Sequence, residues 1–382
     1  MATSPNNTNS HLYPERRMRT DHQQSHRSTK SPGKTETSRY FAPSRPSEKS
    51  RPHETNDDGD DHEHTRSPPE DKSASSGRRQ MLLTFSSSGR LGTRQPLKNP
   101  TPRSDAKRLS LADVAAETLS LLPGLLATRP DVGRDGHLIA PSSTSIALDS
   151  TTGLHLPATK IRVVDSDSIT AALSLPSLGS THPPPLVLNM ANARHAGGGF
   201  KHGALAQEEA LCYRSSLFFT LKIKHYPIPE TGAIYSPRVL VIREDMSQGH
   251  NLLDFRNPAI LPVLSVVSAA AIERPETRRL QIHQHGTVEV YARKSDEELM
   301  KRKMRTILRV AATHGHRQIV LGAFGCGAFQ NPAHEVARMW AEVFAEEEFE
   351  DGVWWKDVIF AVLGQGTENF DAFDRLLAGR VV

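Results

Sequence analysis

Three consecutive glycines, Gly197, Gly198 and Gly199, stand between an apolar run and a helical pattern. Because glycine has no Cβ, the backbone N–H groups of such a loop can approach a phosphate closely, beside the positive end of the following helix. The spacing is not G-x-G-x-x-G, and the Lys and Ser or Thr of a P-loop are missing. The loop predicts a phosphate cradle, and a mobile turn is the alternative that three glycines alone leave open.

An amide and two acids, Gln207, Glu208 and Glu209, follow eight to ten residues after Gly199, in the first turns of that helical pattern. Consecutive glutamates on a helix point about 100° apart, so these two cannot face one bond together. One can enter a cleft while the other has a different task. The alternative is that both only offset the helix dipole, by roughly 0.3 to 1 kcal/mol each.

A second loop of small residues links the apolar run 318–322 to another helical pattern, and Asn331 and Pro332 suit the N-cap and first helical position there. Two such loops at one sheet edge can hold a pyrophosphate from both sides. We expect Cys326 to be a small buried thiol and not a nucleophile, since the sequence places no base beside it. The loop residues are Gly325, Cys326, Gly327, Ala328 and Phe329.

The elements that must position these loops begin after a polar tail. Residues 1–103 are rich in Ser, Pro, Thr, His, Asp and Arg, and we expect this segment to be disordered because it has little apolar surface to bury. The helical pattern 109–125 follows, with Gly124 and Pro130 expected to bound its end. Apolar runs then alternate with helical patterns. Strands are expected at 160–164, 186–190, 238–242, 260–270, 318–322 and 357–363, and helices at 203–221, 295–313, 331–347 and 369–378.

Short apolar strands separated by helices predict an α/β fold in which a mainly parallel sheet is covered on both faces. Ligands bind such sheets where loops leave the carboxyl ends of the strands, and both glycine loops occupy such places. Residues 104–382 are therefore expected to form one domain, with a ligand site at these loops.

Charge and cysteine content argue against a nucleic-acid-binding protein, a disulfide-rich protein and a zinc protein. The first 100 residues hold 17 of the 47 Lys and Arg and 12 of the 43 Asp and Glu, which leaves 30 and 31 for the remainder. A nearly neutral folded part argues against sequence-specific nucleic-acid binding. Cys212 and Cys326 form neither a disulfide framework nor a zinc spacing. With no apolar stretch near the roughly twenty residues that span a bilayer, we expect a soluble intracellular protein, cytoplasmic or nuclear.

The joint pattern LNMANARHAGGGF…GALAQEEALCYRSSLF resembles the signature of poly(ADP-ribose) glycohydrolases, most closely the microbial-type branch. The segment ANARHAGGG also resembles the ribose- and phosphate-binding segment of macro domains, so the resemblance implies a three-layer macro-domain-like fold with a mixed, mainly parallel sheet. It implies that Asn192 hydrogen-bonds the terminal ribose, that both glycine loops hold phosphate, and that Phe329 packs near that ribose. Asp165 and Asp167 match a region that contacts adenine or ribose in macro domains, and an N-cap role is the alternative.

The resemblance also implies the reaction, which is hydrolysis of ribose–ribose O-glycosidic bonds in poly(ADP-ribose). Glu209 would be the general acid and then the base, Glu208 would position the sugar, and Gln207 would contribute to substrate binding. The expected partner is poly(ADP-ribose) or an ADP-ribosylated protein, bound by a monomer with no metal, cofactor or membrane. The alternatives are a macro-domain reader without catalysis, a hydrolase of mono-ADP-ribosylated protein or nucleic acid, and an unrelated nucleotide-binding scaffold.

Overall fold

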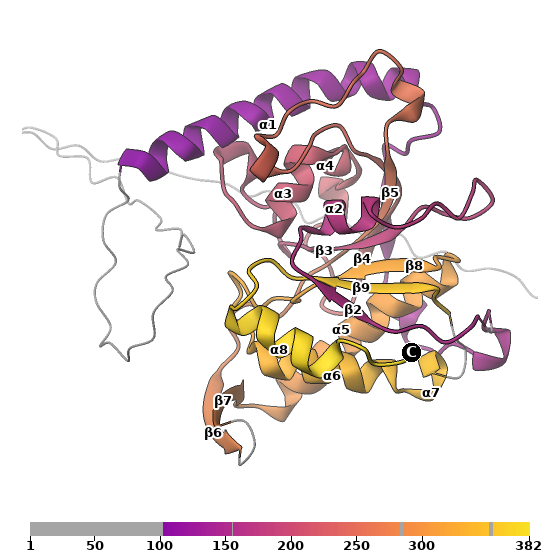
Figure 1. Cartoon of the computed structure of the whole chain (residues 1–382), viewed down its shortest axis with the longest axis vertical. Helices are drawn as coiled ribbons and strands as arrows, with labels where there is room; N and C mark the ends of the chain where they lie inside the picture. The colour runs from indigo at the N-terminus through magenta and orange to yellow at the C-terminus, as the bar shows by residue number, and fades with distance from the viewer. Residues whose placement is uncertain (1–101, 155, 283–285, 351–353) are drawn as a thin grey trace, which may run out of the picture. The chain divides into compact units, whose positions relative to one another are not determined.

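A computed structural model describes residues 102–154, 156–282, 286–350 and 354–382 (Figure 1). The predicted tail, residues 1–103, lies outside this part of the chain except for its last two residues, and its disorder stays a prediction. A seven-stranded sheet in the order β1-β4-β5-β3-β8-β9-β2 forms the centre. The pairs from β5 to β2 are parallel, and β4 pairs antiparallel with both β1 and β5. The fold is therefore the mixed, mainly parallel α/β sheet that the sequence predicted.

The bounds of the elements are as follows. The strands are β1 (His137–Ile139), β2 (Arg162–Val164), β3 (Leu186–Met190), β4 (Ala233–Leu240), β5 (Val263–Ala269), β6 (Thr277–Ile282), β7 (Gly286–Tyr291), β8 (Gln318–Leu321) and β9 (Asp357–Ala361). The helices are α1 (Pro102–Thr128), α2 (Ser168–Leu173), α3 (Gln207–Arg214), α4 (Leu217–Thr220), α5 (Lys294–Thr313), α6 (Ala333–Phe344), α7 (Glu347–Glu350) and α8 (Glu368–Leu377).

Helices cover both faces of the sheet, with α1 to α4 on one side and α5, α6 and α8 on the other (Figure 1). The side chains along β3 alternate between the two faces, and this explains why both faces need a cover of helices. Leu186 and Leu188 belong to the apolar cluster that contains Met304 and Trp340, whereas Val187 belongs to the cluster that contains Leu211. Successive strand residues point to opposite faces, so a continuous apolar run is required when both faces are buried.

Several predicted boundaries were wrong for physical reasons. The expected helix 203–221 is split into α3 and α4, because Ser215 is extended and bridges Val241. Helix α6 begins at Ala333 with Pro332 as its N-cap, so Asn331 is not the cap. The helix α1 continues past Gly124 to Thr128, since Leu122 and Leu126 pack in an apolar cluster beneath it.

The helix α1 also contradicts the expectation that no apolar stretch approaches bilayer length. Its segment Ser110–Thr128 is long and apolar enough to cross a membrane by length and composition, with a mean hydropathy of 1.3. One face of this helix is nevertheless buried against the domain, through Leu111, Ala115 and Leu122. The helix is thus packed as a layer of the fold (Figure 1).

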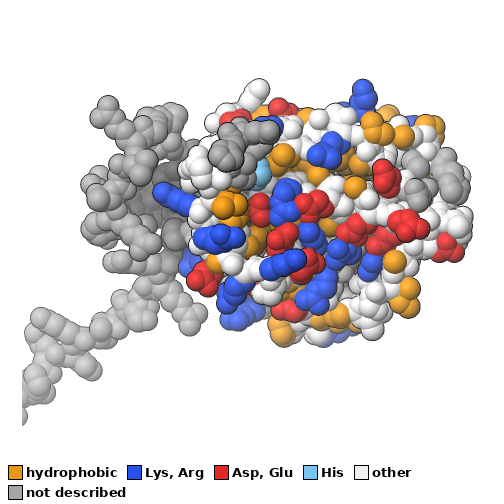
Figure 2. All heavy atoms as spheres, turned by 90° about the horizontal axis from the view of Figure 1, so that it is seen from below, with side chains coloured by type: hydrophobic (Ala, Val, Ile, Leu, Met, Phe, Trp, Pro, Cys, Tyr) orange, Lys and Arg blue, Asp and Glu red, His pale blue; other side chains and the backbone are white. Residues whose placement is uncertain are grey.

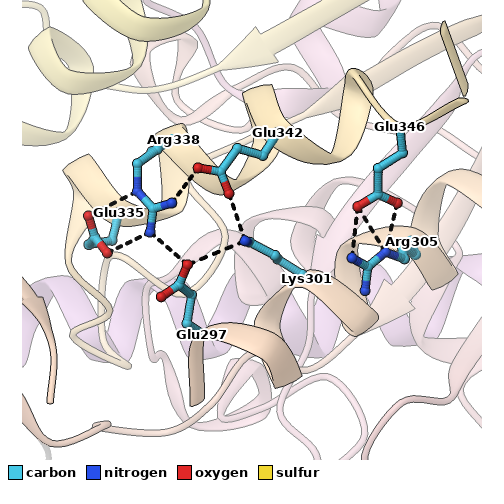
Figure 3. Close-up of polar contacts among 7 residues, drawn as sticks. All are labelled: Glu297, Lys301, Arg305, Glu335, Arg338, Glu342 and Glu346. Carbon is cyan, nitrogen blue, oxygen red and sulfur yellow. Dashed lines mark hydrogen bonds and ion pairs between the residues drawn. The ribbon is translucent and has the colours of Figure 1, made fainter. Parts of the chain in front are cut away.

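Charged side chains of both signs are interspersed over the face formed by the last helices (Figure 2). On this face Arg338 of α6 pairs with Glu335 at 2.8 Å and with Glu297 of α5 at 2.9 Å, and it also pairs with Glu342 (Figure 3). Lys301 joins the same group through Glu342 at 2.7 Å. The network therefore holds α5 and α6 together above the sheet.

We expect Arg338→Met to lower the free energy of unfolding by about 1 to 2 kcal/mol, because it removes the shared partner of three carboxylates, of which Glu335 is buried. The loss should shrink as salt screens the network, and urea unfolding at low and high ionic strength measures it. Arg256→Met is the control, since Arg256 is 91% exposed and, among the described residues, pairs with Asp254 alone. Equal losses in the two variants would contradict a stabilising network.

Candidate active site

The first glycine loop runs from the carboxyl end of β3 to the start of α3, and its shape depends on residues that adopt positive φ. Gly197 and Gly198 have φ of 69° and 56°. A Cβ on Gly198 would lie 2.3 Å from Oε1 of Glu209 and 3.3 Å from Oε2 of Glu208. Both carboxylates therefore lie against the backbone of Gly198, and any side chain there would displace them.

Glu208 is held by backbone and side-chain donors at the end of β3. Its Oε2 accepts the N–H of Asn192 at 2.7 Å, and its Oε1 lies 3.4 Å from Nδ2 of Asn189. The side chain is buried, and burial raises the pKa of Glu208 to about 8, although the N–H of Asn192 opposes the shift. The nearby charge of Glu209 contributes to the same rise, which favours the protonated form of Glu208 at neutral pH.

Glu209 is positioned differently, although it is the next residue. Its Oε1 accepts the N–H of Gly199 at 2.8 Å, and its other oxygen makes no hydrogen bond within the described residues. The two acids thus differ in what they can still do. Glu208 has donors at both oxygens, whereas Glu209 keeps one oxygen available for a substrate.

The backbone donors of the first loop are largely used by the loop itself. The N–H of Gly198 donates to the carbonyl of His195, and that of Gly199 donates to Glu209. In this structure the N–H of Gly199 holds a carboxylate and that of Gly198 closes a turn, and the predicted phosphate cradle stays a prediction for this loop.

Gln207 joins α3 to β3. Its Oε1 accepts the N–H of Met190 at 2.9 Å, and its Nε2 donates to the carbonyl of Leu188 at 2.7 Å and to Ser168 at 3.1 Å. Both ends of the amide are therefore engaged within the protein. The contacts place the first turn of α3, and with it both glutamates, at the edge of the sheet.

Asn192 forms a turn with the residues that follow it. Its Oδ1 accepts the N–H groups of Arg194 and His195 at 2.9 and 3.0 Å, which leaves Nδ2 as the group that can donate to a ligand. Asn192 also lines a cavity of about 210 Å³, with Ala193, Arg194 and His195 on one side and Ala271, Glu273 and Phe329 on the other. The structure thus brings the predicted residues Asn192 and Phe329 to one cavity.

The second loop is anchored by Asn331, although this residue does not cap α6. Its Nδ2 donates to the carbonyl of Ile272 at 2.7 Å, and its Oδ1 accepts the hydroxyl of Tyr291 at 2.8 Å. Gly325, with φ of 78°, is in close contact with Asn331 and Ala271. These contacts tie the loop to the root of the β6–β7 hairpin.

Backbone donors remain available in the middle of this loop. Within the part of the chain that the structure describes, the N–H groups of Gly327, Ala328 and Phe329 make no hydrogen bond. Cys326 next to them has a thiol whose pKa is raised by burial. The thiol therefore stays protonated, which agrees with the prediction that it is not a nucleophile.

Two acids that the sequence left undecided have structural partners. Both oxygens of Asp165 accept backbone N–H groups, those of Gly364 at 2.8 Å and Gln365 at 3.0 Å. Asp167 is the N-cap of α2 and also pairs with Arg214. The N-cap alternative is confirmed for Asp167.

Other residues at the site were missed. Tyr226 has a buried hydroxyl with no hydrogen-bond partner within the described residues, and burial and the charge of Glu208 both raise its pKa. Glu273 follows the carboxyl end of β5. It could have been predicted, because ligands of parallel sheets bind at the carboxyl ends of the strands. No pattern in the sequence marks Tyr226.

Across the described ranges, no group of three His, Cys, Asp or Glu side chains is arranged to hold a metal ion.

Comparisons with protein families give two separate matches along the chain. Residues 136–244 match the family model described as the catalytic domain of microbial-type PARG, that is, poly(ADP-ribose) glycohydrolase. Residues 274–340 match the model of the macro domain. A search of curated protein sequences finds no match to the chain.

Solved structures similar to this chain cover most of it. The poly(ADP-ribose) glycohydrolase of Thermomonospora curvata is 26% identical, with 70% of this chain and 99% of that chain covered and a TM-score of 0.55. Its complex with the inhibitor ADP-HPD has the same identity and coverage and a TM-score of 0.54. The enzyme of Deinococcus radiodurans in complex with ADP-ribose is 27% identical, with 67% and 97% covered and a TM-score of 0.51.

The observed fold thus agrees with these comparisons. The described part of the chain is similar to the catalytic domain of the microbial-type poly(ADP-ribose) glycohydrolases, built on a macro-domain fold, and the resemblance predicted from its motifs is confirmed.

Proposed function

We propose that this protein hydrolyses ribose–ribose O-glycosidic bonds in poly(ADP-ribose) and releases ADP-ribose. The observation that carries the proposal is the unequal pair of glutamates. Both lie against Gly198, but only Glu209 keeps an oxygen that no donor in the described residues occupies. The similarity to glycohydrolases whose structures hold ADP-ribose or ADP-HPD supplies the substrate class.

In the proposed reaction Glu209 acts twice. As an acid it donates its proton to the ribose oxygen that departs, while the bond from that oxygen to the anomeric carbon breaks and leaves an oxocarbenium-like sugar. As a carboxylate it then accepts a proton from the water that attacks the same carbon. The second proton transfer restores the acid, so no other reactant is needed.

Glu208 is a positioning residue in this proposal. Its raised pKa supplies a neutral carboxyl group that can hydrogen-bond a sugar hydroxyl without adding charge beside a pyrophosphate. In this proposal Glu209 accepts the N–H of Gly199 through one oxygen and presents its other oxygen to the bond that is cleaved.

The remaining residues are proposed to bind the terminal ADP-ribose unit. Nδ2 of Asn192 donates to a ribose hydroxyl, and the ring of Phe329 packs on the same sugar across the cavity. The unoccupied N–H groups of Gly327, Ala328 and Phe329 hold the pyrophosphate. We propose that the protein acts as a monomer. We also propose that it acts in the cytoplasm or nucleus, because the thiols of Cys212 and Cys326 are free, as is usual in a reducing compartment.

We expect Glu209→Gln to lower the rate of ADP-ribose release from poly(ADP-ribose) by at least about 100-fold, because the amide cannot donate a proton to the departing oxygen. ADP-ribose binding should be kept, since the amide oxygen can still accept the N–H of Gly199. Release assays and calorimetry on the full chain measure the two effects.

Glu347→Gln is the matched control, because Glu347 is an exposed acid in the first turn of another helix, α7, and shows what the same substitution does there. It should leave release unchanged. Binding of ADP-ribose by the parent protein without any release would instead identify a reader. Release only from mono-ADP-ribosylated protein would identify the other hydrolase.

The raised pKa of Glu208 predicts a pH dependence of ADP-ribose binding. Glu208 is neutral below pH 8 and charged above it, so the ionised form should repel the pyrophosphate and the Kd should rise by up to about tenfold per pH unit above pH 8. Calorimetry between pH 6 and pH 9.5 measures this rise.

Glu208→Gln should abolish the rise, because the amide stays neutral at every pH in that range. A Kd that does not change above pH 8 in the parent protein, or the same rise in the variant, would show that Glu208 is not the titrating group.

A further inference from the structure

The outer rim of the cavity carries two side chains that the proposed reaction does not use. Arg194 and His195 line the cavity next to Asn192, and both are exposed. Their backbone N–H groups donate to Oδ1 of Asn192, so the main chain at this rim is fixed. The Cα positions of Arg194 and His195 are therefore fixed beside the proposed ribose site.

The guanidinium of Arg194 is unusual among the arginines near the site. Within the described residues it makes no hydrogen bond and no ion pair, whereas Arg214 and Arg243 each pair with an acid. Unpaired guanidinium groups at the mouth of a cavity suit a planar, multidentate anion such as a phosphate.

A second arginine without a side-chain partner in the described residues follows Glu273, which lines the same cavity. This residue, Arg274, has φ of 50° and donates its backbone N–H to the carbonyl of Phe329 at 2.8 Å. Its guanidinium also makes no hydrogen bond or ion pair within the described ranges. An exposed arginine therefore adjoins each of two cavity-lining segments, and the Glu273 carboxylate restricts where an anion can lie.

We infer that Arg194, together with Arg274 and His195, binds the pyrophosphate of the ADP-ribose unit on the leaving side of the scissile bond. The inference rests on the proposed function, which places the terminal ribose between Asn192 and Phe329. The preceding unit must then leave through the open mouth, where these side chains are. Its pyrophosphate is the only strongly anionic group in that unit, and its negative charge is opposite to that of the arginines.

This site sets the preference for chains over single units. A lone ADP-ribose has no preceding unit, so it cannot use the rim, whereas a chain of two or more units gains additional charge-assisted hydrogen bonds there. The rim should therefore affect chain binding and leave the affinity for ADP-ribose unchanged.

The test compares a purified two-unit chain with ADP-ribose, both binding to the Glu209→Gln full-length protein, which holds substrate without cutting it. We expect Arg194→Gln in this background to weaken two-unit binding about tenfold, and Arg194→Gln/Arg274→Gln to weaken it further, with the Kd for ADP-ribose unchanged. In the active protein, Arg194→Gln should raise KM for poly(ADP-ribose) with kcat kept.

Arg134→Gln is the control, because Arg134 is exposed, makes no ion pair in the described residues, and precedes the end of β1 that lies away from the cavity. Equal weakening by Arg134→Gln and Arg194→Gln would reduce the effect to net charge and overturn the inference. Equal weakening of ADP-ribose and two-unit binding would assign Arg194 to the terminal unit and also overturn it. Absence of release by the parent protein would instead refute the glycohydrolase, while the two binding constants would still decide whether the rim binds a second unit.

Discussion

The close contact between two carboxylates and the backbone of Gly198 is the constraint on which the rest of the site depends. Burying an acid side chain is costly unless donors satisfy it, and here the backbone of one short loop supplies them. The N–H groups of Asn192 and Gly199 hold Glu208 and Glu209 respectively. That geometry requires a residue without Cβ at Gly198, and it requires α3 to begin within reach of the loop.

The sheet supplies that placement. Strands β5, β3 and β8 are parallel neighbours, so the residues that follow them, including Glu273, Asn192 and Phe329, meet at one edge. Gln207 fastens α3 to the end of β3, and Asn331 fastens the second loop to β7 and to Ile272. Chemistry at this edge thus depends on side chains whose own role is to connect elements.

The sequence predicted the elements that bury a continuous apolar run, such as β3, and the long amphipathic helix α5. It missed β1 and α2, which have three and six residues and too little periodicity, and the β6–β7 hairpin, whose strands are too polar to form a continuous apolar run. Residue types and spacing identified the glutamates and both loops. They could not show that the side-chain amides of Gln207 and Asn331 form hydrogen bonds within the protein. Nor could they show that burial raises the pKa of Glu208. Both properties depend on residues that are distant in the sequence.

The bond between the Gly199 N–H and Glu209 also bears on how such a protein can change during evolution. In a site whose acid stands apart from the ligand loop, one substitution removes catalysis and leaves a binding protein. Here the acid is part of the loop's own hydrogen bonding, so replacing it with an apolar residue leaves a main-chain donor without its acceptor and releases the conformation of Gly198. A descendant that only binds ADP-ribose would therefore need a second, compensating change in the loop, unless the first change were to an isosteric amide.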